Sequence, residues 1–140
     1  MTDKTDLIAA AEKLYDSWAD AFAKADIEAL IKLYAHDVVV ESPLVSVLLK
    51  SEEGIVRGRD NVRSFLLKIL EKSGGLADRY RINFYTNGKT MIWEYPRITP
   101  TGRQTEMAEV MEIEDGLIKA HRIYWGWESA RNLYSAGYNG

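Results

Sequence analysis

Hydrophobic positions in the first half of the chain recur at helical spacing and predict three helices. Over residues 5–24 they form one stripe, which indicates an amphipathic first helix. Asp26 can cap a second, short helix over residues 27–34. A third stripe follows Asp60 and predicts a helix that ends at Gly74-Gly75. The first stripe consists of Ile8, Ala11, Tyr15, Trp18, Phe22 and Ala25, and the third of Val62, Phe65, Leu66, Ile69 and Leu70.

A short strand is expected between the second and third helices. Val38-Val39-Val40 is β-branched throughout, and Ser42-Pro43 ends the run because proline cannot donate to a ladder. The following residues 44–57 lack a clean period, with an apolar first half and an acidic second half. We interpret residues 44–49 as a flap over an apolar site, although a short core strand or an interface segment fits the same run.

From residue 76 on, the pattern predicts only strands and turns, which form a four-stranded meander. The expected elements are a strand over 80–86, a tight Asn87-Gly88 turn, a strand over 91–98, a turn over 100–102, and two strands joined at Glu114-Asp115-Gly116. Helices followed by strands, without repeats or linkers, indicate an α+β fold in a single domain spanning residues 1–140.

The last hairpin carries the strongest candidate chemistry. If its turn has three residues, with Gly116 in the left-handed region, Glu109 lies opposite His121 on one face of the sheet. The other pairs of that register are Ile113 with Leu117, Met107 with Ile123 and Thr105 with Trp125. A two-residue turn would instead pair Glu109 with Arg122 and leave His121 opposite Val110.

Composition and charge narrow the classes of function. The chain has 140 residues, of which 46 % are hydrophobic and 28 % charged, as expected for one globular domain. A net charge of -3 provides no basic surface for nucleic acid or for an anionic membrane. Without Cys and with two His, the chain has no thiol nucleophile, and we expect no metal site.

The sequence also bears on where the protein acts. Its first residues are acidic where a signal peptide would be basic, so we interpret them as part of the mature first helix. The most apolar stretch, residues 38–49, is too short to span a membrane and contains Glu41 and Pro43. We therefore expect a cytoplasmic protein.

Three segments in this order resemble the nuclear-transport-factor-2-like superfamily, in particular its SnoaL-like and ketosteroid-isomerase branches. The segments are LYAHDVVVESPL, GRDNVRSFL and GLIKAHRIYW. The resemblance implies a cone-shaped half-barrel, in which three N-terminal helices pack on a strongly curved, mostly antiparallel sheet. It also implies a homodimer formed through the outer face of the sheet, which here carries Ala108, Val110, Arg122 and Tyr124.

The ketosteroid-isomerase site transfers poorly to this sequence. Ketosteroid isomerase uses an Asp base with an oxyanion hole made of a Tyr and a protonated Asp. By resemblance, the Tyr position falls on Trp18, the base on Ser42 and the second acid on Glu109. The cyclase and epoxide-hydrolase relatives use carboxylates on later strands, but Gly126 stands where many of them carry Asp. Steroid isomerisation of the familiar kind is therefore not expected.

The remaining candidates are the residues that would line a pocket inside the cone. We expect ligand contacts from Trp18, Phe22, Ser42, Trp93, Tyr95, Met107, Ile123 and Trp125. Aromatic and Met residues at this spacing are more commonly plain core, which is the competing interpretation for each of them. Such a lining suits a small apolar or aromatic ligand with one or two polar groups.

Three functions remain open from the sequence. The first is cofactor-free acid–base catalysis, such as isomerisation, cyclisation, dehydration or hydration, with His121 as the acid or base and Glu109 as its partner. The second is a non-catalytic domain that senses or carries a ligand in the same pocket. The third is a dimerisation module with a vestigial pocket.

Overall fold

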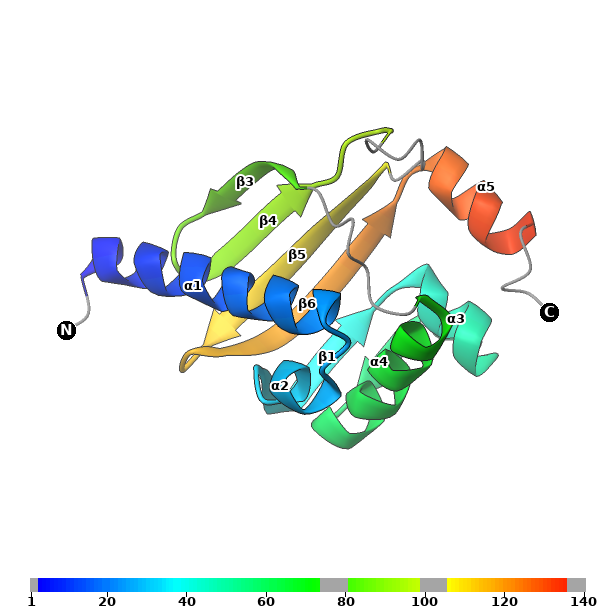
Figure 1. The fold of residues 1–140 in the computed structure, drawn as a ribbon, viewed down its shortest axis with the longest axis horizontal. Helices are drawn as coiled ribbons and strands as arrows, with labels where there is room; N and C mark the ends of the chain where they lie inside the picture. The colour runs from blue at the N-terminus through cyan, green and yellow to red at the C-terminus, as the bar shows by residue number, and fades with distance from the viewer. Residues whose placement is uncertain (1–2, 74–80, 99–105, 136–140) are drawn as a thin grey trace.

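Five helices lie on one side of a curved six-stranded sheet in a computed structural model of the chain, which describes residues 3–73, 81–98 and 106–135 (Figure 1). The helices are α1 (Lys4–Ala23), α2 (Ile27–Ile31), α3 (Pro43–Leu49), α4 (Arg59–Ser73) and α5 (Trp127–Ser135). The strands are β1 (Tyr34–Glu41), β2 (Ile55–Arg57), β3 (Ile82–Thr86), β4 (Thr90–Glu94), β5 (Met107–Glu114) and β6 (Leu117–Trp125). This architecture confirms the expected α+β cone.

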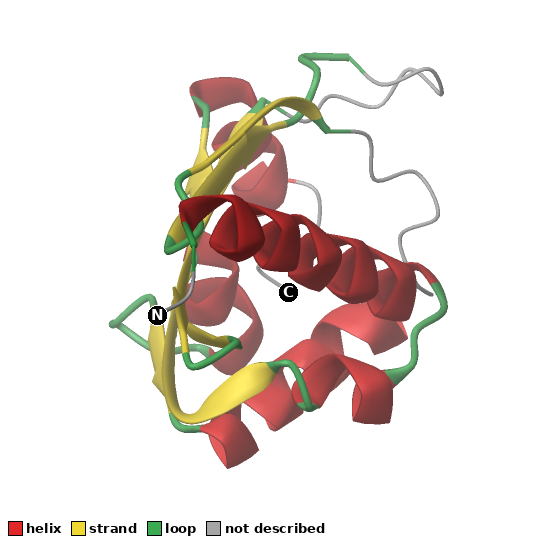
Figure 2. Cartoon of the chain, turned by 90° about the vertical axis from the view of Figure 1, so that its left-hand side faces the viewer, coloured by secondary structure: helices red, strands yellow, loops and turns green. Residues whose placement is uncertain are grey.

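The sheet has the strand order β2-β1-β6-β5-β4-β3. Strands β3 to β6 form the expected antiparallel meander. Strand β1 pairs with β6 in parallel, and β2 adds an antiparallel edge beside β1. Strand β1 therefore lies beside β6, although the two are far apart in the sequence. The described helices leave the opposite face of the sheet uncovered (Figure 2).

Helices α1 and α4 lie where the hydrophobic stripes place them, but three local expectations are wrong. The second helix ends at Ile31, and Tyr34 begins β1 instead of closing the helix. The segment interpreted as a flap is the helix α3, which the side chain of Ser42 caps by accepting from the Leu44 N–H at 3.1 Å. Helix α5 was not expected, since everything after residue 76 was assigned to strands and turns.

The turns differ in detail from the expected ones. The β3–β4 connection is centred on Gly88 and Lys89, because the Asn87 N–H donates to the Thr90 carbonyl at 3.3 Å. Asn87 supports this turn from its side chain by accepting from the Lys89 and Thr90 N–H groups. The expected helix end at 74–75 and the turn over 100–102 lie outside the described residues.

The β5–β6 hairpin has a two-residue turn followed by a bulge. Asp115 and Gly116 have φ values of 53° and 77°, as a type I′ turn requires, and Glu114 pairs with Leu117. The register then shifts by one residue between Glu112 and Ile113. Both expected registers are therefore wrong in their pairs: Glu109 lies opposite Ile123, and Met111 lies opposite His121.

The faces of the hairpin nevertheless agree with the three-residue register. The two-residue turn moves the pairing by one position and the bulge by another, which restores the original alternation. Glu109 and His121 consequently share the inner face, which α1 covers. Ala108, Val110, Arg122 and Tyr124 share the outer face, as expected.

The core lies between α1 and the inner face of the sheet. Its centre is aromatic: Trp18 and Trp93 are 1 % and 0 % exposed, with ring centroids 5.4 Å apart, and Tyr15 lies 4.9 Å from Trp93. Within the described residues, no helix is both long and apolar enough to cross a bilayer.

Candidate functional site

A carboxylate and an imidazole meet in the core beneath α1. Glu109 Oε1 lies 2.6 Å from His121 Nε2, and the two residues are only 2 % and 3 % exposed. Glu109 comes from β5 and His121 from β6, and they meet diagonally across the ladder. The sequence thus placed both residues on the correct face, and the structure brings their side chains into contact.

Two further residues continue the hydrogen-bond chain beyond the imidazole. His121 Nδ1 lies 3.0 Å from the Tyr34 hydroxyl, and Trp18 Nε1 donates to that hydroxyl at 3.0 Å. Because an indole nitrogen can only donate, the Tyr34 oxygen accepts from Trp18 and can pass its own hydrogen to Nδ1. A neutral His121 would then carry its proton on Nε2 and donate it to Glu109. Each of these groups has a partner in this arrangement.

Tyr95 satisfies the other carboxylate oxygen. Its hydroxyl donates to Glu109 Oε2, so both oxygens of Glu109 are engaged. Tyr95 follows the last residue of β4 and extends the ladder, since its N–H donates to the Met107 carbonyl at 3.0 Å. A buried carboxylate is tolerated only when hydrogen-bonded or paired, and here Tyr95 and His121 fulfil that condition.

Strand β1 supplies the residue of this network that the sequence did not identify. Tyr34 is fully buried and lies opposite Ile118 of β6 in the parallel ladder. The hydrophobic pattern includes Tyr34 in the second helix over residues 27–34, whereas in the structure it begins β1. The signal that could have identified it is the pairing of β1 with β6, which the local pattern does not contain.

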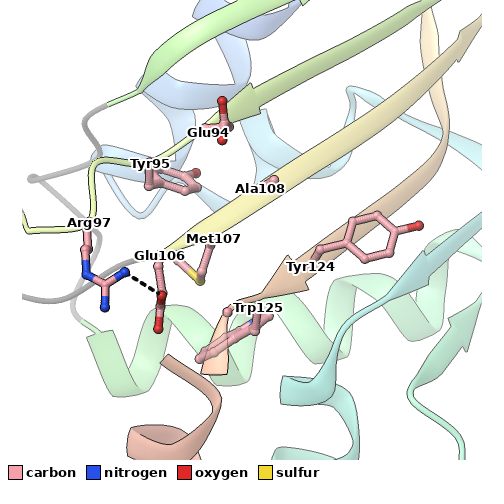
Figure 3. Close-up of a pocket in the computed structure, with 9 residues that line it drawn as sticks. Glu94, Tyr95, Arg97, Glu106, Met107, Ala108, Tyr124 and Trp125 are labelled. Carbon is pink, nitrogen blue, oxygen red and sulfur yellow. Dashed lines mark ion pairs between the residues drawn. The ribbon is translucent and has the colours of Figure 1, made fainter. Parts of the chain in front are cut away.

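A pocket of about 480 Å³ opens where β4, β5 and β6 end (Figure 3). It is lined by Glu94, Tyr95, Arg97, Glu106, Met107, Ala108, Tyr124, Trp125 and Gly126. Three of the expected ligand-binding residues therefore lie here: Tyr95, Met107 and Trp125. Tyr95 also hydrogen-bonds Glu109, so it joins the pocket to the buried pair.

The other expected ligand contacts lie elsewhere. Trp18, Phe22 and Trp93 are at most 2 % exposed in the core, and Ile123 is half-buried opposite Glu109. Ser42 is 5 % exposed, and its hydroxyl serves as the cap of α3. None of these five residues lines the pocket at the strand ends.

The carboxylate of Glu106, the residue before β5, occupies the space beside Gly126. A Cβ atom on Gly126 would lie 2.6 Å from both Cγ and Cδ of Glu106. Glu106 Oε1 accepts from the N–H groups of Glu128 and Ser129 at the start of α5, and Oε2 lies 3.5 Å from Arg97 Nη1. Glu106 therefore caps α5 and anchors it to the pocket rim, which only a glycine at position 126 permits.

Charged side chains elsewhere form exposed pairs. Asp37 lies within β1, and its carboxylate is 2.6 Å from Lys119 Nζ. The hydrogen bond from Lys119 lowers the pKa of Asp37, and the same bond raises the pKa of Lys119. On the outer face, the hydrogen bond to Glu112 raises the pKa of Arg122. In the described part of the chain, no three His, Asp or Glu side chains gather as metal ligands.

The chain is similar in structure to several solved proteins of low sequence identity. A SnoaL-like protein of unknown function from Burkholderia thailandensis has 19 % identity and a TM-score of 0.71, with 84 % of this chain and 95 % of that chain covered. An LEH-like epoxide hydrolase from M. tuberculosis has 15 % identity and a TM-score of 0.62, with 89 % and 88 % covered.

A putative polyketide cyclase from Sinorhizobium meliloti has 17 % identity and a TM-score of 0.60, with 79 % of this chain and 93 % of that chain covered. At such identities the likeness shows the fold alone. No curated protein matches the sequence at a significant level. Residues 15–121, most of the chain, match the SnoaL-like domain, and the protein therefore belongs to the SnoaL-like family of the nuclear-transport-factor-2-like superfamily.

Proposed function

We propose that the protein is an enzyme that performs cofactor-free acid–base chemistry on an apolar small molecule, with Glu109 as the group that takes and returns the proton and His121 as its partner. The observation that carries the proposal is the 2.6 Å contact between the two side chains in an aromatic core. A carboxylate and an imidazole in contact can exchange a proton, and a site that excludes water strengthens their electrostatic effect on a reacting group.

Tyr95 provides the path between the pocket and the pair. A proton leaving a ligand can pass to the Tyr95 oxygen while the phenol transfers its own proton to Glu109 Oε2. The reverse movement returns a proton to the product, so the step balances without a cofactor. His121 holds Glu109 in position through Oε1, and Tyr34 and Trp18 orient the imidazole from behind.

The pocket favours a ligand with an apolar or aromatic body. Met107, Trp125 and the Tyr95 ring offer apolar surface, whereas Arg97 and Glu106 already pair with each other at the rim. Two structural neighbours are described as a putative polyketide cyclase and an epoxide hydrolase, which supports a cyclisation or a hydration.

Two conservative substitutions test the catalytic role. Thermal-shift screening of aromatic ketones, epoxides and polyketide-like compounds would select ligands, and proton NMR in D2O would follow their conversion. Glu109→Gln and His121→Asn should each lower the rate by about 100-fold or more while the Kd changes by less than about threefold. Tyr85→Phe, on the exposed outer face, is the matched control. Unchanged rates in both variants would reject the proposed pair.

A second candidate is a non-catalytic domain that carries or senses a ligand in the same pocket. The observation in its favour is that both Glu109 oxygens are engaged while Ser42 caps a helix and position 126 is glycine. This candidate predicts that Trp125→Ala weakens binding of any ligand that raises the unfolding temperature. It further predicts that no such ligand is converted.

We also propose that the protein forms a homodimer through the outer face of its sheet. That face carries Tyr85, Ile92 and Tyr124, which are 62 %, 40 % and 55 % exposed, and the described helices lie on the other side (Figure 2). Exposed aromatic and aliphatic side chains clustered on an uncovered sheet are typical of an interaction surface.

A further inference from the structure

Arg81 holds its guanidinium against two aromatic rings at the edge of the core. Its Cζ atom lies 4.1 Å from the centroid of the Tyr15 ring on α1 and 3.9 Å from that of Phe84 on β3. The two rings are 5.5 Å apart and tilted by 58°, so they form a corner in which the cation rests. Cation–π contact stabilises the charge there, but it provides no acceptor for the N–H donors.

Arg81 differs in this respect from the other arginines that the structure describes. Each of those lies within hydrogen-bond or ion-pair distance of an oxygen, as shown by Arg57, Arg59, Arg63, Arg97, Arg122 and Arg131. The Nη1 atom of Arg81 is buried and has no hydrogen-bond acceptor among the described residues. A buried donor of a charged group that lacks an acceptor is costly, which points to an acceptor from beyond the described residues.

A second donor of the same kind lies in the same aromatic cluster. Trp93 is fully buried, its Nε1 likewise has no acceptor among the described residues, and its ring meets Tyr15 edge-on at 4.9 Å. Trp93 also lies 5.4 Å from Trp18, whose ring is 5.7 Å from that of His121. The cluster thus runs from Arg81 at the edge of the core to the buried pair.

We infer that Arg81 and the aromatic corner beside it form a recognition site for an aromatic carboxylate. The planar guanidinium matches a carboxylate with two parallel hydrogen bonds, and its single charge matches a monoanion. Arg81 is half-buried, so part of its side chain is open to solvent although Nη1 is buried. Phe84 is half-buried and presents aromatic surface next to the cation, against which the ring of the ligand packs, and the buried Tyr15 holds the cation from the core side.

The site is independent of the proposed catalysis, because binding requires no turnover. If Glu109 and His121 prove inert, the recognition of a carboxylate at Arg81 is unaffected, and the reverse also holds.

The test compares two probes of the same shape, 2-naphthoate and the neutral 2-naphthamide. Isothermal titration should show that the protein binds the carboxylate about tenfold more tightly than the amide. Arg81→Gln should abolish this preference, and Arg81→Lys should retain part of it because the charge remains while the planar fork is lost. Arg57→Gln is the control. It removes an exposed arginine on β2 that pairs with Glu53, and it should leave the preference for the carboxylate intact.

An NMR titration of the wild-type protein tests the site without depending on the folding of any variant. On titration with 2-naphthoate, the indole N–H resonance of Trp93 should shift, whereas that of Trp127, which is 75 % exposed on α5, should not. The absence of any preference for the carboxylate in the wild-type protein would overturn the inference. So would a preference that survives Arg81→Gln in a variant with native circular dichroism.

Discussion

Glu109 contacts His121 across a diagonal of the sheet, not across a ladder pair. Ile123 is the ladder partner of Glu109 and Met111 that of His121, yet the carboxylate oxygen and the ring nitrogen lie 2.6 Å apart. On its other side, the imidazole meets Tyr34, which comes from β1. Three strands therefore fix the position of one imidazole ring, and the stability of the fold should depend on its hydrogen bonds.

Removing the Tyr34 hydroxyl should be costly for stability. Tyr34→Phe leaves the buried Trp18 Nε1 and His121 Nδ1 without their shared partner. We expect a loss of about 2–3 kcal/mol in the free energy of unfolding, since unsatisfied buried groups cost about 1–3 kcal/mol each. Urea denaturation followed by Trp fluorescence measures it.

Tyr85→Phe provides the control, because it removes the same atom from a side chain that is 62 % exposed on the outer face. This variant should stay within about 0.5 kcal/mol of the wild type. Equal stabilities for the two variants would show that the network around His121 contributes nothing measurable.

Gly126→Ala should loosen helix α5. The added Cβ would lie 2.6 Å from Glu106 Cδ and 2.8 Å from the Glu106 carbonyl oxygen, so the capping carboxylate must move. We expect a loss of about 1–2 kcal/mol, the typical range for a lost helix cap. Amide hydrogen exchange should accelerate at Glu128 and Ser129.

Glu106→Ala removes the same cap without the added methyl group. Its effect and that of Gly126→Ala should be less than additive in the double variant, because both act on one contact. Full additivity would contradict the assignment of Glu106 as the cap of α5.

Two glycines with positive φ separate backbone strain from crowding. Gly116 has a φ of 77° and open space around it, whereas a Cβ on Gly88, whose φ is 92°, would lie 2.5 Å from Leu7 Cβ on α1. Gly116→Ala should therefore cost about 1 kcal/mol through strain alone. Gly88→Ala should cost clearly more, because the β3–β4 turn packs against α1. Thermal unfolding of both variants measures the difference, and equal losses would contradict that packing.

The pair formed by Asp37 and Lys119 should stabilise the fold over a defined range of pH. The pKa of Asp37 is lowered, so its contribution is present above the ordinary pKa of 3.8 and is lost as pH falls through the folded value. The pKa of Lys119 is raised, so its contribution is present below 10.5 and is lost as pH rises through the folded value.

Carbon-detected NMR titration can measure the pKa of Asp37 directly. In Lys119→Met the value should rise to the ordinary range, since the largest cause of the shift is the hydrogen bond from Lys119. Lys89→Met, which removes a cation from the β3–β4 turn, should leave it unchanged. An Asp37 pKa that is identical in the Lys119 variant and the wild type would contradict the pairing.

Charge on the outer sheet face should separate the proposed dimer. Tyr124→Glu places a carboxylate among exposed apolar side chains, opposite Ala108 in the ladder. In a dimer, the two introduced carboxylates, one from each subunit, would repel each other or lose their hydration in the interface. Sedimentation should therefore give a monomer for the variant and a dimer for the wild type. Trp127→Glu, on the exposed surface of α5, is the control. A monomeric wild-type protein would exclude the dimer.

The sequence predicted much of the fold because its signals were local. The stripe containing Trp18 and Phe22 lies on one helix, and the meander follows from alternating runs between turn residues. The family resemblance added the cone and the face of Glu109. It could not supply the bulge at Lys119, because a bulge depends on how neighbouring strands twist and pair.

The candidate site was predicted in part, for the same reason. Glu109 and His121 belong to one hairpin. Their shared face was predicted correctly because the shorter turn and the bulge each shift the register by one residue, and the two shifts together restore the alternation of faces. Tyr34 and Ser42 were misassigned because their roles depend on distant or downstream structure: a parallel ladder for Tyr34 and an unexpected helix for Ser42. Arg81 carried no local signal, since its aromatic neighbours come from α1 and β3.

The parallel pairing of β1 with β6 also has a consequence for biosynthesis. Tyr34 and His121 are 87 positions apart, so their contact closes a long loop and cannot form until the segment that carries His121 has been synthesised. Earlier segments can form helices, but the β1 edge has no β6 to pair with. The nascent chain should therefore expose that edge until β6 has emerged from the ribosome, which makes it a point of contact for chaperones.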